Sequence, residues 1–324
     1  MPAYNAEKYI AEAINSILSQ TFTDFEFIII NDASIDSTKE IIESFQDSRI
    51  ILINNKQNQG VANSLNIGIS AARGKYIARM DADDISLPKR FQTQFDFMEQ
   101  NPNIDICGTW SKTFGDYVTS WETYQKHDDI RDASFFFCPM IHPTIMFRKD
   151  LSLQYSLDFP RAEDYDIWCK KINELNFANI PEILLLYRTH YCQIGAAHQS
   201  EQKLNAKDIR VRNLKSIGIS LEEKELKIYN DIFSEQFKPQ NMEEIVFAIK
   251  ILEKISIEGL NHGYGKIFQE IIKFYQKKAT DFGINNKTTS LKLYFTIFRK
   301  LKIFKTPRTH LRYIYHCLRN LLHL

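Results

Sequence analysis

The chain has 324 residues, 44% of them hydrophobic and 25% charged, and its formal net charge is +1. This length suits one large or two ordinary domains, and the apolar share excludes wholesale disorder and collagen-like or mucin-like chains. The sequence contains neither an apolar run of the ~18 to 20 residues that span a membrane nor an N-terminal signal peptide. The five cysteines form no C-x-x-C pair, so we expect no zinc site or disulfide framework and a cytoplasmic location.

The first two hundred residues alternate between strand and helix patterns. Short β-branched apolar runs predict strands, and apolar residues at helical spacing between them predict helices. The strands are expected over 25–30, 50–54 and 75–80, and the helices over 37–45 and 61–72. This alternation predicts an α/β fold with a mostly parallel sheet flanked by helices, in which ligands bind beyond the carboxyl ends of the strands.

Beyond residue 200 the strand pattern stops. Stretches rich in Lys and Glu, with apolar residues every three to four positions, predict helices over 226–233, 242–257 and 266–278. We therefore expect three regions along the chain. They are an α/β catalytic domain, a smaller helical domain and a basic amphipathic segment, with the bounds 1–200, 201–284 and 285–324.

The segment 285–324 carries nine Lys or Arg and no Asp or Glu, so its formal charge is +9. Its aromatic and aliphatic residues recur at helical spacing between the basic ones, and Pro307 divides it into two pieces. This pattern favours helices lying in an anionic membrane interface over nucleic-acid binding. A helix pair packed on the catalytic domain or on a second subunit is the alternative, and a homo-oligomer is compatible with it.

Asp32 ends the first predicted strand, within Ile30-Asn-Asp-Ala-Ser34. An Asp at such a place commonly caps a helix or a turn. It can also accept a hydrogen bond from the base or sugar edge of a nucleotide. The sequence leaves both interpretations open.

Asp81, Asp83 and Asp84 follow the predicted strand 75–80. Three carboxylates within four residues repel one another, and a divalent cation with a preference for oxygen ligands, Mg²⁺ or Mn²⁺, relieves that repulsion. A bound metal can neutralise a diphosphate leaving group. An acidic surface loop is the alternative.

A third acidic group, Glu163-Asp164-Tyr-Asp166, opens a predicted amphipathic helix. Acidic residues are favourable in a first helical turn because of the helix dipole. A carboxylate there could also act as a general base, with its pKa raised by its acidic neighbours.

Taken in order, these elements resemble the family-two glycosyltransferases, which have the GT-A fold. The resemblance covers residues 1–195. It rests on a series of short motifs: Met1-Pro-Ala-Tyr-Asn-Ala6, Phe25-Glu-Phe-Ile-Ile-Ile-Asn-Asp-Ala-Ser-Ile-Asp-Ser-Thr38, Asn58-Gln-Gly60, Leu65-Asn-Ile-Gly68, Ala72-Arg-Gly-Lys-Tyr-Ile77, Met80-Asp-Ala-Asp-Asp84 and Ala162-Glu-Asp-Tyr-Asp-Ile-Trp168.

The resemblance implies a nucleotide-sugar donor, a divalent metal (Mn²⁺ or Mg²⁺) and inversion at the anomeric carbon. By motif position, Asp32 would bind the imide edge of the nucleobase and Asp81 would face the ribose or the metal. The remaining nucleotide-binding residues implied by the motifs are Pro2, Ala3, Tyr4, Asn58, Gly60 and Asn66.

The resemblance also assigns the chemistry. Asp83 would ligate the metal, and Asp164 would be the catalytic base. His190 lies 26 residues after Asp164, where several relatives place a metal ligand, although a surface or core histidine is an equal alternative. His142-Pro143 also resembles the family, without an assigned role.

The chain departs from the family pattern at its start. Relatives carry four or five apolar residues before the Pro-x-Tyr-Asn element, and these form the first central strand. Here the element begins at Pro2, so we expect that strand to be nearly absent, with an exposed sheet edge and lost apolar burial. We expect the natural start to lie upstream; the alternative is that the fold tolerates the loss.

The sequence thus predicts a metal-dependent inverting glycosyltransferase. The expected donor is a UDP-sugar, and the expected acceptor is a hydroxyl of a glycan or lipid-linked glycan of a bacterial surface polysaccharide. The expected location is the cytoplasm, with 285–324 on the inner face of the membrane. The alternatives are a non-catalytic sugar-nucleotide-binding or scaffold protein and a sugar-nucleotide pyrophosphorylase. The latter normally has an N-terminal Gly-rich, Lys-containing phosphate loop, and this chain does not.

Overall fold

The computed structural model describes residues 1–190, 199–234, 236–239, 241–264 and 269–270. The chain divides into two compact units after Arg210, within helix α8 (Gln199–Ser216). This division falls ten residues after the boundary expected at residue 200. The segment 285–324, with its expected membrane contact, and most of the expected helix 266–278 lie outside the described residues.

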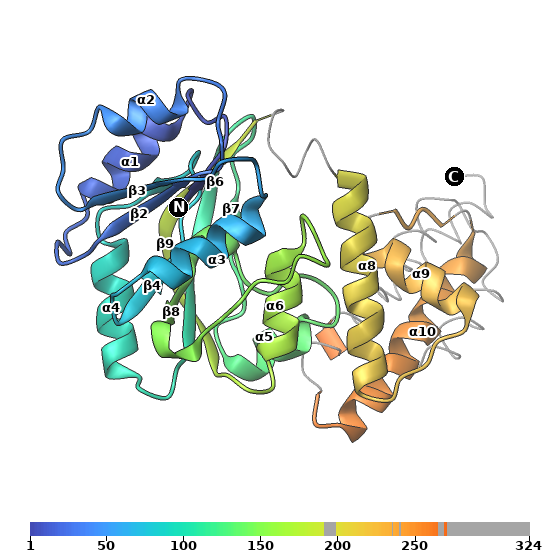
Figure 1. The fold of residues 1–324 in the computed structure, drawn as a ribbon. Helices are drawn as coiled ribbons and strands as arrows, with labels where there is room; N and C mark the ends of the chain where they lie inside the picture. The colour runs from blue at the N-terminus through green and yellow to red at the C-terminus, as the bar shows by residue number, and fades with distance from the viewer. Residues whose placement is uncertain (191–198, 235, 240, 265–268, 271–324) are drawn as a thin grey trace, which may run out of the picture. The chain divides into compact units, whose positions relative to one another are not determined.

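The N-terminal unit is a mixed α/β structure (Figure 1). Its helices are α1 (Ile10–Leu18), α2 (Thr38–Glu43), α3 (Val61–Ala71), α4 (Arg90–Gln100), α5 (His127–Ala133) and α6 (Glu163–Lys171), with 3-10 turns η1 (His142–Thr144) and η2 (Lys149–Leu151). Its strands are β1 (Pro2–Ala3), β2 (Phe27–Asn31), β3 (Ile50–Asn54), β4 (Tyr76–Ala78), β5 (Ile85–Ser86), β6 (Ile106–Gly115), β7 (Ser120–Trp121), β8 (Met146–Arg148) and β9 (Phe177–Thr189).

The strands form two sheets. The first is fully parallel, in the order β1-β2-β3, and α1 and α2 lie on one side of it with α3 on the other (Figure 1). The second is mixed, in the order β4-β8-β6-β9-β5 with β7 on β6, and β6 and β9 are its parallel pair. The α/β class is confirmed. The antiparallel pairs were not predicted, because apolar runs reveal burial without revealing the direction of the neighbouring strand.

Amphipathic spacing decides the main core. Ile10, Ile14 and Ile17 lie on one face of α1 and are at most 1% exposed, and they pack in one cluster with Phe27 and Ile29 of β2. A second cluster surrounds the fully buried Trp168 of α6. Its ring meets that of Phe177 edge to face at 6.0 Å, which fixes α6 against the mixed sheet.

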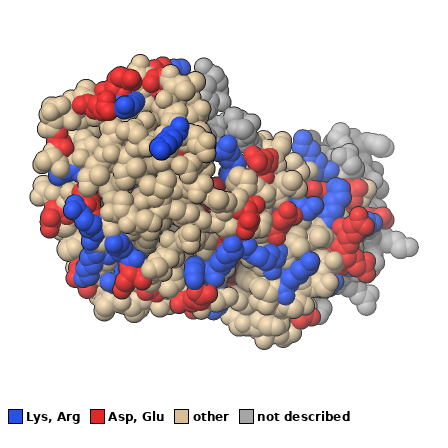
Figure 2. Space-filling model, viewed as in Figure 1, with Lys and Arg blue, Asp and Glu red and all other residues tan. Residues whose placement is uncertain are grey.

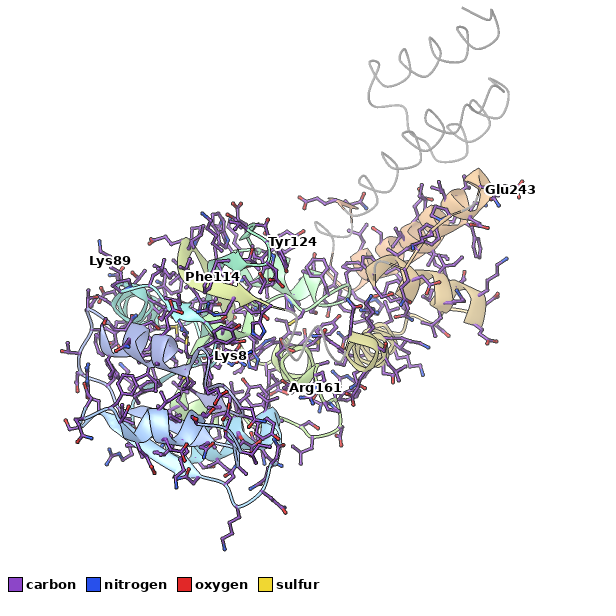
Figure 3. The ribbon with its side chains drawn as sticks, turned by 90° about the horizontal axis from the view of Figure 1, so that it is seen from above. Lys8, Lys89, Phe114, Tyr124, Arg161 and Glu243 are labelled. Carbon is purple, nitrogen blue, oxygen red and sulfur yellow. The ribbon has the colours of Figure 1, made fainter. Side chains whose placement is uncertain are left out.

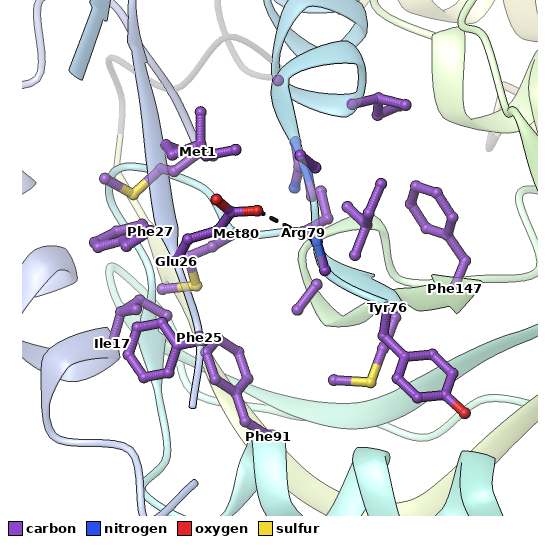
Figure 4. A pocket seen from close by; sticks show the side chains of 18 of the residues that line it. Met1, Ile17, Phe25, Glu26, Phe27, Tyr76, Arg79, Met80, Phe91 and Phe147 are labelled. Carbon is purple, nitrogen blue, oxygen red and sulfur yellow. Dashed lines mark hydrogen bonds between the residues drawn. The ribbon is translucent and has the colours of Figure 1, made fainter. Parts of the chain in front are cut away.

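The first strand is short, as predicted. Pro2 and Ala3 pair with Ile30 and Asn31, and the Met1 nitrogen donates to the Ile28 oxygen at 2.9 Å. A cavity of about 590 Å³ lies between β2 and β4. Figure 4 shows Phe27 and Met80 on one side of it and Tyr76 and Phe147 on the other. The residues facing this cavity are mostly apolar, so it could accommodate further apolar side chains.

The C-terminal unit is helical in its described part. The helices α9 (Glu223–Phe233) and α10 (Met242–Asn261) match the predictions over 226–233 and 242–257. Ile232 packs against Ile245 and Ile249, and Glu243 marks the first turn of α10 in Figure 3. None of the described helices is long and apolar enough to cross a bilayer. On the face in Figure 2, the described residues mix both signs of charge.

Because the cavity is lined mostly by apolar residues, we expect apolar residues added before Met1 to stabilise the fold. Placing Val-Ile-Val-Ile before Met1 should raise the free energy of unfolding by about 2–4 kcal/mol. Burial of a β-branched side chain contributes ~1.5–3 kcal/mol, and ordering a residue costs ~1–2 kcal/mol. Urea unfolding measures the difference, with Gly-Ser-Asn-Gly as the matched control. Equal stability of the two extended proteins would show that the cavity does not accept a strand.

Candidate active site

The Asp32 carboxylate ties the end of β2 to the loop before α3. Its Oδ1 accepts from Asn55 Nδ2 at 2.6 Å and from the Gln59 nitrogen at 3.0 Å, and its Oδ2 accepts from the Gly60 nitrogen at 2.9 Å. The side chain is 3% exposed. Gly60 is the N-cap of α3 and no side chain caps that helix, so Asp32 orders the loop before α3 and does not cap it. A contact with a nucleobase remains a prediction.

The ends of β1 and β2 adjoin at this edge. The Asp32 nitrogen donates to the Ala3 oxygen at 2.8 Å, and Ala3 is buried while Tyr4 is 47% exposed. Asn5 adopts a left-handed conformation, and its Oδ1 accepts from the Ile35 nitrogen at 3.0 Å. Pro2, Ala3 and Tyr4 thus lie along the edge that Asp32 occupies, and Tyr4 is exposed; their contact with a nucleobase remains a prediction.

The other three implied nucleotide residues separate into two places. Asn58 is exposed, and its Oδ1 accepts from the Gly60 nitrogen at 3.2 Å, so both belong to the Asp32 loop. Gly60 has φ +83°, which side-chain-bearing residues rarely adopt. Asn66 instead bonds the backbone of Tyr155 twice, at 2.8 and 2.9 Å. It joins α3 to the segment that precedes α6.

Asp81, Asp83 and Asp84 form a compact acidic cluster between β4 and β5. One carboxylate oxygen of each lies within 4.8 Å of the others. Burial and the neighbouring Asp81 charge raise the pKa of Asp83 and, more strongly, that of Asp84. Asp84 is 1% exposed, and its Oδ2 has no hydrogen-bond partner among the described residues. A cation would relieve both the repulsion and the unpartnered oxygen.

The end of β9 closes over this cluster. His190 Nε2 lies 3.1 Å from Asp83 Oδ2, although the two residues are 107 positions apart. The Arg188 nitrogen donates to Asp84 Oδ1 at 2.8 Å, and its Nε donates to the Asp83 oxygen at 2.7 Å. The Tyr9 ring lies 4.9 Å from the His190 ring. Carboxylates with one imidazole form a donor set that fits Mn²⁺ or Mg²⁺.

Asp164 and Glu163 open helix α6. Asp164 Oδ1 accepts from the Tyr165 nitrogen at 2.7 Å, and its Oδ2 lies 3.4 Å from the Cys138 thiol. Burial raises the pKa of Asp164, and burial together with the Asp164 charge raises the pKa of Glu163 to about 7. Glu163 is 7% exposed, and its Oε2 has no partner among the described residues. A carboxylate with a raised pKa suits a general base.

Arg79 links the two acidic groups. Its guanidinium is 7% exposed and pairs with Asp81, and its charge lowers the pKa of both Glu163 and Asp164. Arg79 is not among the residues predicted from the sequence, although a basic residue in an apolar stretch two positions before Asp81 was a visible signal.

His142 and Tyr155 pair beside this region. His142 Nε2 lies 2.8 Å from the Tyr155 hydroxyl, and burial lowers the pKa of His142, which is therefore neutral. The Asp164 and Glu163 charges act on the Tyr155 hydroxyl, so this pair lies near the proposed base. His142 was noted in the sequence, but nothing there pointed to Tyr155.

Comparisons with known proteins define the class. Residues 1–158 match the family model described as Glycosyl transferase family 2. An uncharacterized glycosyltransferase of Haemophilus influenzae is 37% identical over 251 residues, covering 71% of this chain and 76% of that protein. The chain therefore belongs to the family-2 glycosyltransferases and is an enzyme of sugar transfer.

Two further proteins show the range of this similarity. The Escherichia coli UDP-Glc:alpha-D-GlcNAc-diphosphoundecaprenol beta-1,3-glucosyltransferase WfgD is 29% identical over 211 residues, covering 63% of this chain and 81% of WfgD. The crystal structure of S. aureus TarS 1-349 in complex with UDP-GlcNAc matches with a TM-score of 0.56 and 18% identity, covering 79% of each chain. The second match confirms the GT-A fold.

The contacts of Asp32 lead to a stability prediction. In Asp32→Ala, three donors lose their acceptor, and we expect the free energy of unfolding to fall by about 2–4 kcal/mol, since an unpartnered buried polar group costs ~1–3 kcal/mol. Urea unfolding measures this, with exposed Asp24→Ala as the control. A variant of unchanged stability but weaker nucleotide binding would instead make the nucleotide contact the main role of Asp32.

Proposed function

We propose that this glycosyltransferase moves a sugar from a UDP-sugar to a hydroxyl of a lipid-linked glycan, with inversion and with the help of a divalent metal. One observation carries the proposal. Arg79 interacts electrostatically with two acidic groups. One is Asp164, a half-buried carboxylate with a raised pKa, and the other is the acidic cluster that contacts His190. A base and a cation site thus serve the same reaction centre.

The metal would be held by Asp83 and His190, with Asp81 and Asp84 adding negative charge. When bound, Mn²⁺ or Mg²⁺ neutralises the charge of the diphosphate leaving group. The unpartnered Oδ2 of Asp84 supports a cation at this acidic cluster, because a buried carboxylate oxygen without a donor is costly. Arg79 limits the net negative charge that the donor diphosphate meets.

The chemical step is a single displacement. Asp164 takes the proton of the acceptor hydroxyl, and the hydroxyl oxygen attacks the anomeric carbon from the face opposite the nucleotide. The bond between that carbon and the phosphate oxygen breaks, and the diphosphate leaves with the electron pair. A raised pKa makes the ionised form of Asp164 a stronger base.

Donor and acceptor classes come from the relatives. The name of WfgD gives a UDP-sugar donor and a diphosphoundecaprenol-linked acceptor, which supports the same classes here. The nucleoside would lie along Pro2, Ala3, Tyr4 and the Asp32 loop, where Tyr4 is exposed. Acting on a lipid-linked acceptor also agrees with the proposed membrane contact of 285–324.

Replacing the base tests the chemistry. Asp164→Asn should lower kcat by about 10²–10⁴-fold, the usual contribution of general base catalysis, while UDP affinity stays within twofold. Turnover is measured as release of UDP from UDP-sugars with a lipid-linked acceptor. The exposed Asp158→Asn is the matched control. Wild-type turnover in Asp164→Asn would remove Asp164 from the mechanism.

The metal site makes a separate prediction. Calorimetry of the protein with Mn²⁺ should show one site, which Asp83→Ala abolishes and His190→Ala weakens by about 10–100-fold, because each removes a ligand. Activity should vanish in excess chelator and return with Mn²⁺. Equal Mn²⁺ affinity in the wild type and in Asp83→Ala would place the cation elsewhere.

A further inference from the structure

Cys138 lies beside the proposed base, although sequence analysis gave it no role. It belongs to the segment between α5 and η1, and its Sγ is 3.4 Å from Asp164 Oδ2. The same Sγ is also 3.4 Å from the Met140 oxygen. A thiol has one proton, so it can donate to only one of these acceptors at a time.

The ionised Asp164 carboxylate is the preferred acceptor of the two. A hydrogen bond to an ionised carboxylate is about twice as strong as one to a neutral carbonyl. Burial and the Asp164 charge raise the pKa of the Cys138 thiol, so the thiol keeps its proton and remains a donor. The thiol therefore donates to Asp164 when Asp164 is ionised and can turn to Met140 when Asp164 is protonated.

The backbone around Cys138 is firmly placed against α6. The Tyr165 hydroxyl donates to the Ser134 oxygen at 2.7 Å, and the Cys169 thiol lies 3.7 Å from the same oxygen. Cys138 packs in one apolar cluster with Tyr165 and Ile209. The thiol is thus presented to Asp164 by contacts that involve neither the metal cluster nor the Asp32 loop.

The other groups around Asp164 do not duplicate this contact. Glu163 repels the Asp164 charge and Arg79 attracts it. The Asp164 charge also raises the pKa of the Tyr155 hydroxyl. The Tyr165 nitrogen fixes Oδ1. Among the described residues, the Cys138 thiol is the side-chain donor at Oδ2, the oxygen that would accept the proton of the acceptor hydroxyl.

We propose that Cys138 is a positioning residue for Asp164. Its thiol holds Oδ2 in place and stabilises the ionised form that accepts the acceptor proton. The inference rests on the proposed base role of Asp164 and adds a residue on which the working pH range of that base depends.

The experiment compares Cys138→Ala and Cys138→Ser with the wild type in the pH dependence of kcat/KM. Loss of a donor to the charged form raises the pKa of Asp164, so the rising limb should move to higher pH by about half a unit in Cys138→Ala. A serine hydroxyl restores a donor and should return the limb to the wild-type position or below. Cys169→Ala removes a neighbouring thiol that contacts the Ser134 oxygen and not Asp164, so it should leave the limb in place.

Infrared spectroscopy supplies a readout without activity. The S–H stretching band that disappears in Cys138→Ser should shift to higher frequency in Asp164→Asn, because a neutral amide is a weaker acceptor. An unmoved band, an unshifted limb in Cys138→Ala, or failure of Cys138→Ser to restore it would each overturn the inference. Wild-type turnover in Asp164→Asn would instead overturn the proposed function, while the infrared arm would still report on the contact.

Discussion

The site depends on holding carboxylates together where water cannot fully screen them. Asp83, Asp84, Glu163 and Asp164 all have raised pKa values, chiefly because they are buried. Arg79 opposes this cost from the end of β4. Its backbone is fixed on both sides, since its nitrogen donates to the Ile145 oxygen and its oxygen accepts from Arg90. A buried cation held by backbone contacts just after β4 thus offsets part of the negative charge of the site.

Three distant parts of the chain form the candidate site. The loop after β4 supplies the acidic cluster, the residue after β9 is His190, and the start of α6 supplies Asp164, the proposed base. The pairing of β5 with β9 joins the first two, because Ile85, the residue after Asp84, lies opposite Leu186, four residues before His190. The anchoring of Trp168 positions the third. The mixed sheet, more than the parallel one, assembles the chemistry.

The sequence allowed the acidic groups, the strands β2, β3 and β4 and the helices α9 and α10 to be predicted, because each is a local pattern of polarity. It did not reveal the hydrogen-bond donors to Asp32. Asn55 and Gln59 are ordinary loop residues in the sequence, and only the folded chain brings their N–H groups to the Asp32 carboxylate. Cys138 escaped for the same reason, as its partner is 26 positions away. His190 was anticipated by motif position, and its contact with Asp83 depends on register in β9.

The hairpin between β6 and β7 constrains which sequences can carry this site. Gly115 pairs with Thr189, the residue before His190, and a Cβ at Gly115 would lie 2.3 Å from the Thr189 oxygen. Tyr117 and Val118, two and three residues after Gly115, are exposed. Substitutions are therefore expected to be tolerated at Tyr117 and Val118, at the tip of the hairpin, but not at Gly115, at its base. An exchange at Gly115 would displace the end of β9, so this surface turn limits which sequences can keep His190 in its place beside Asp83.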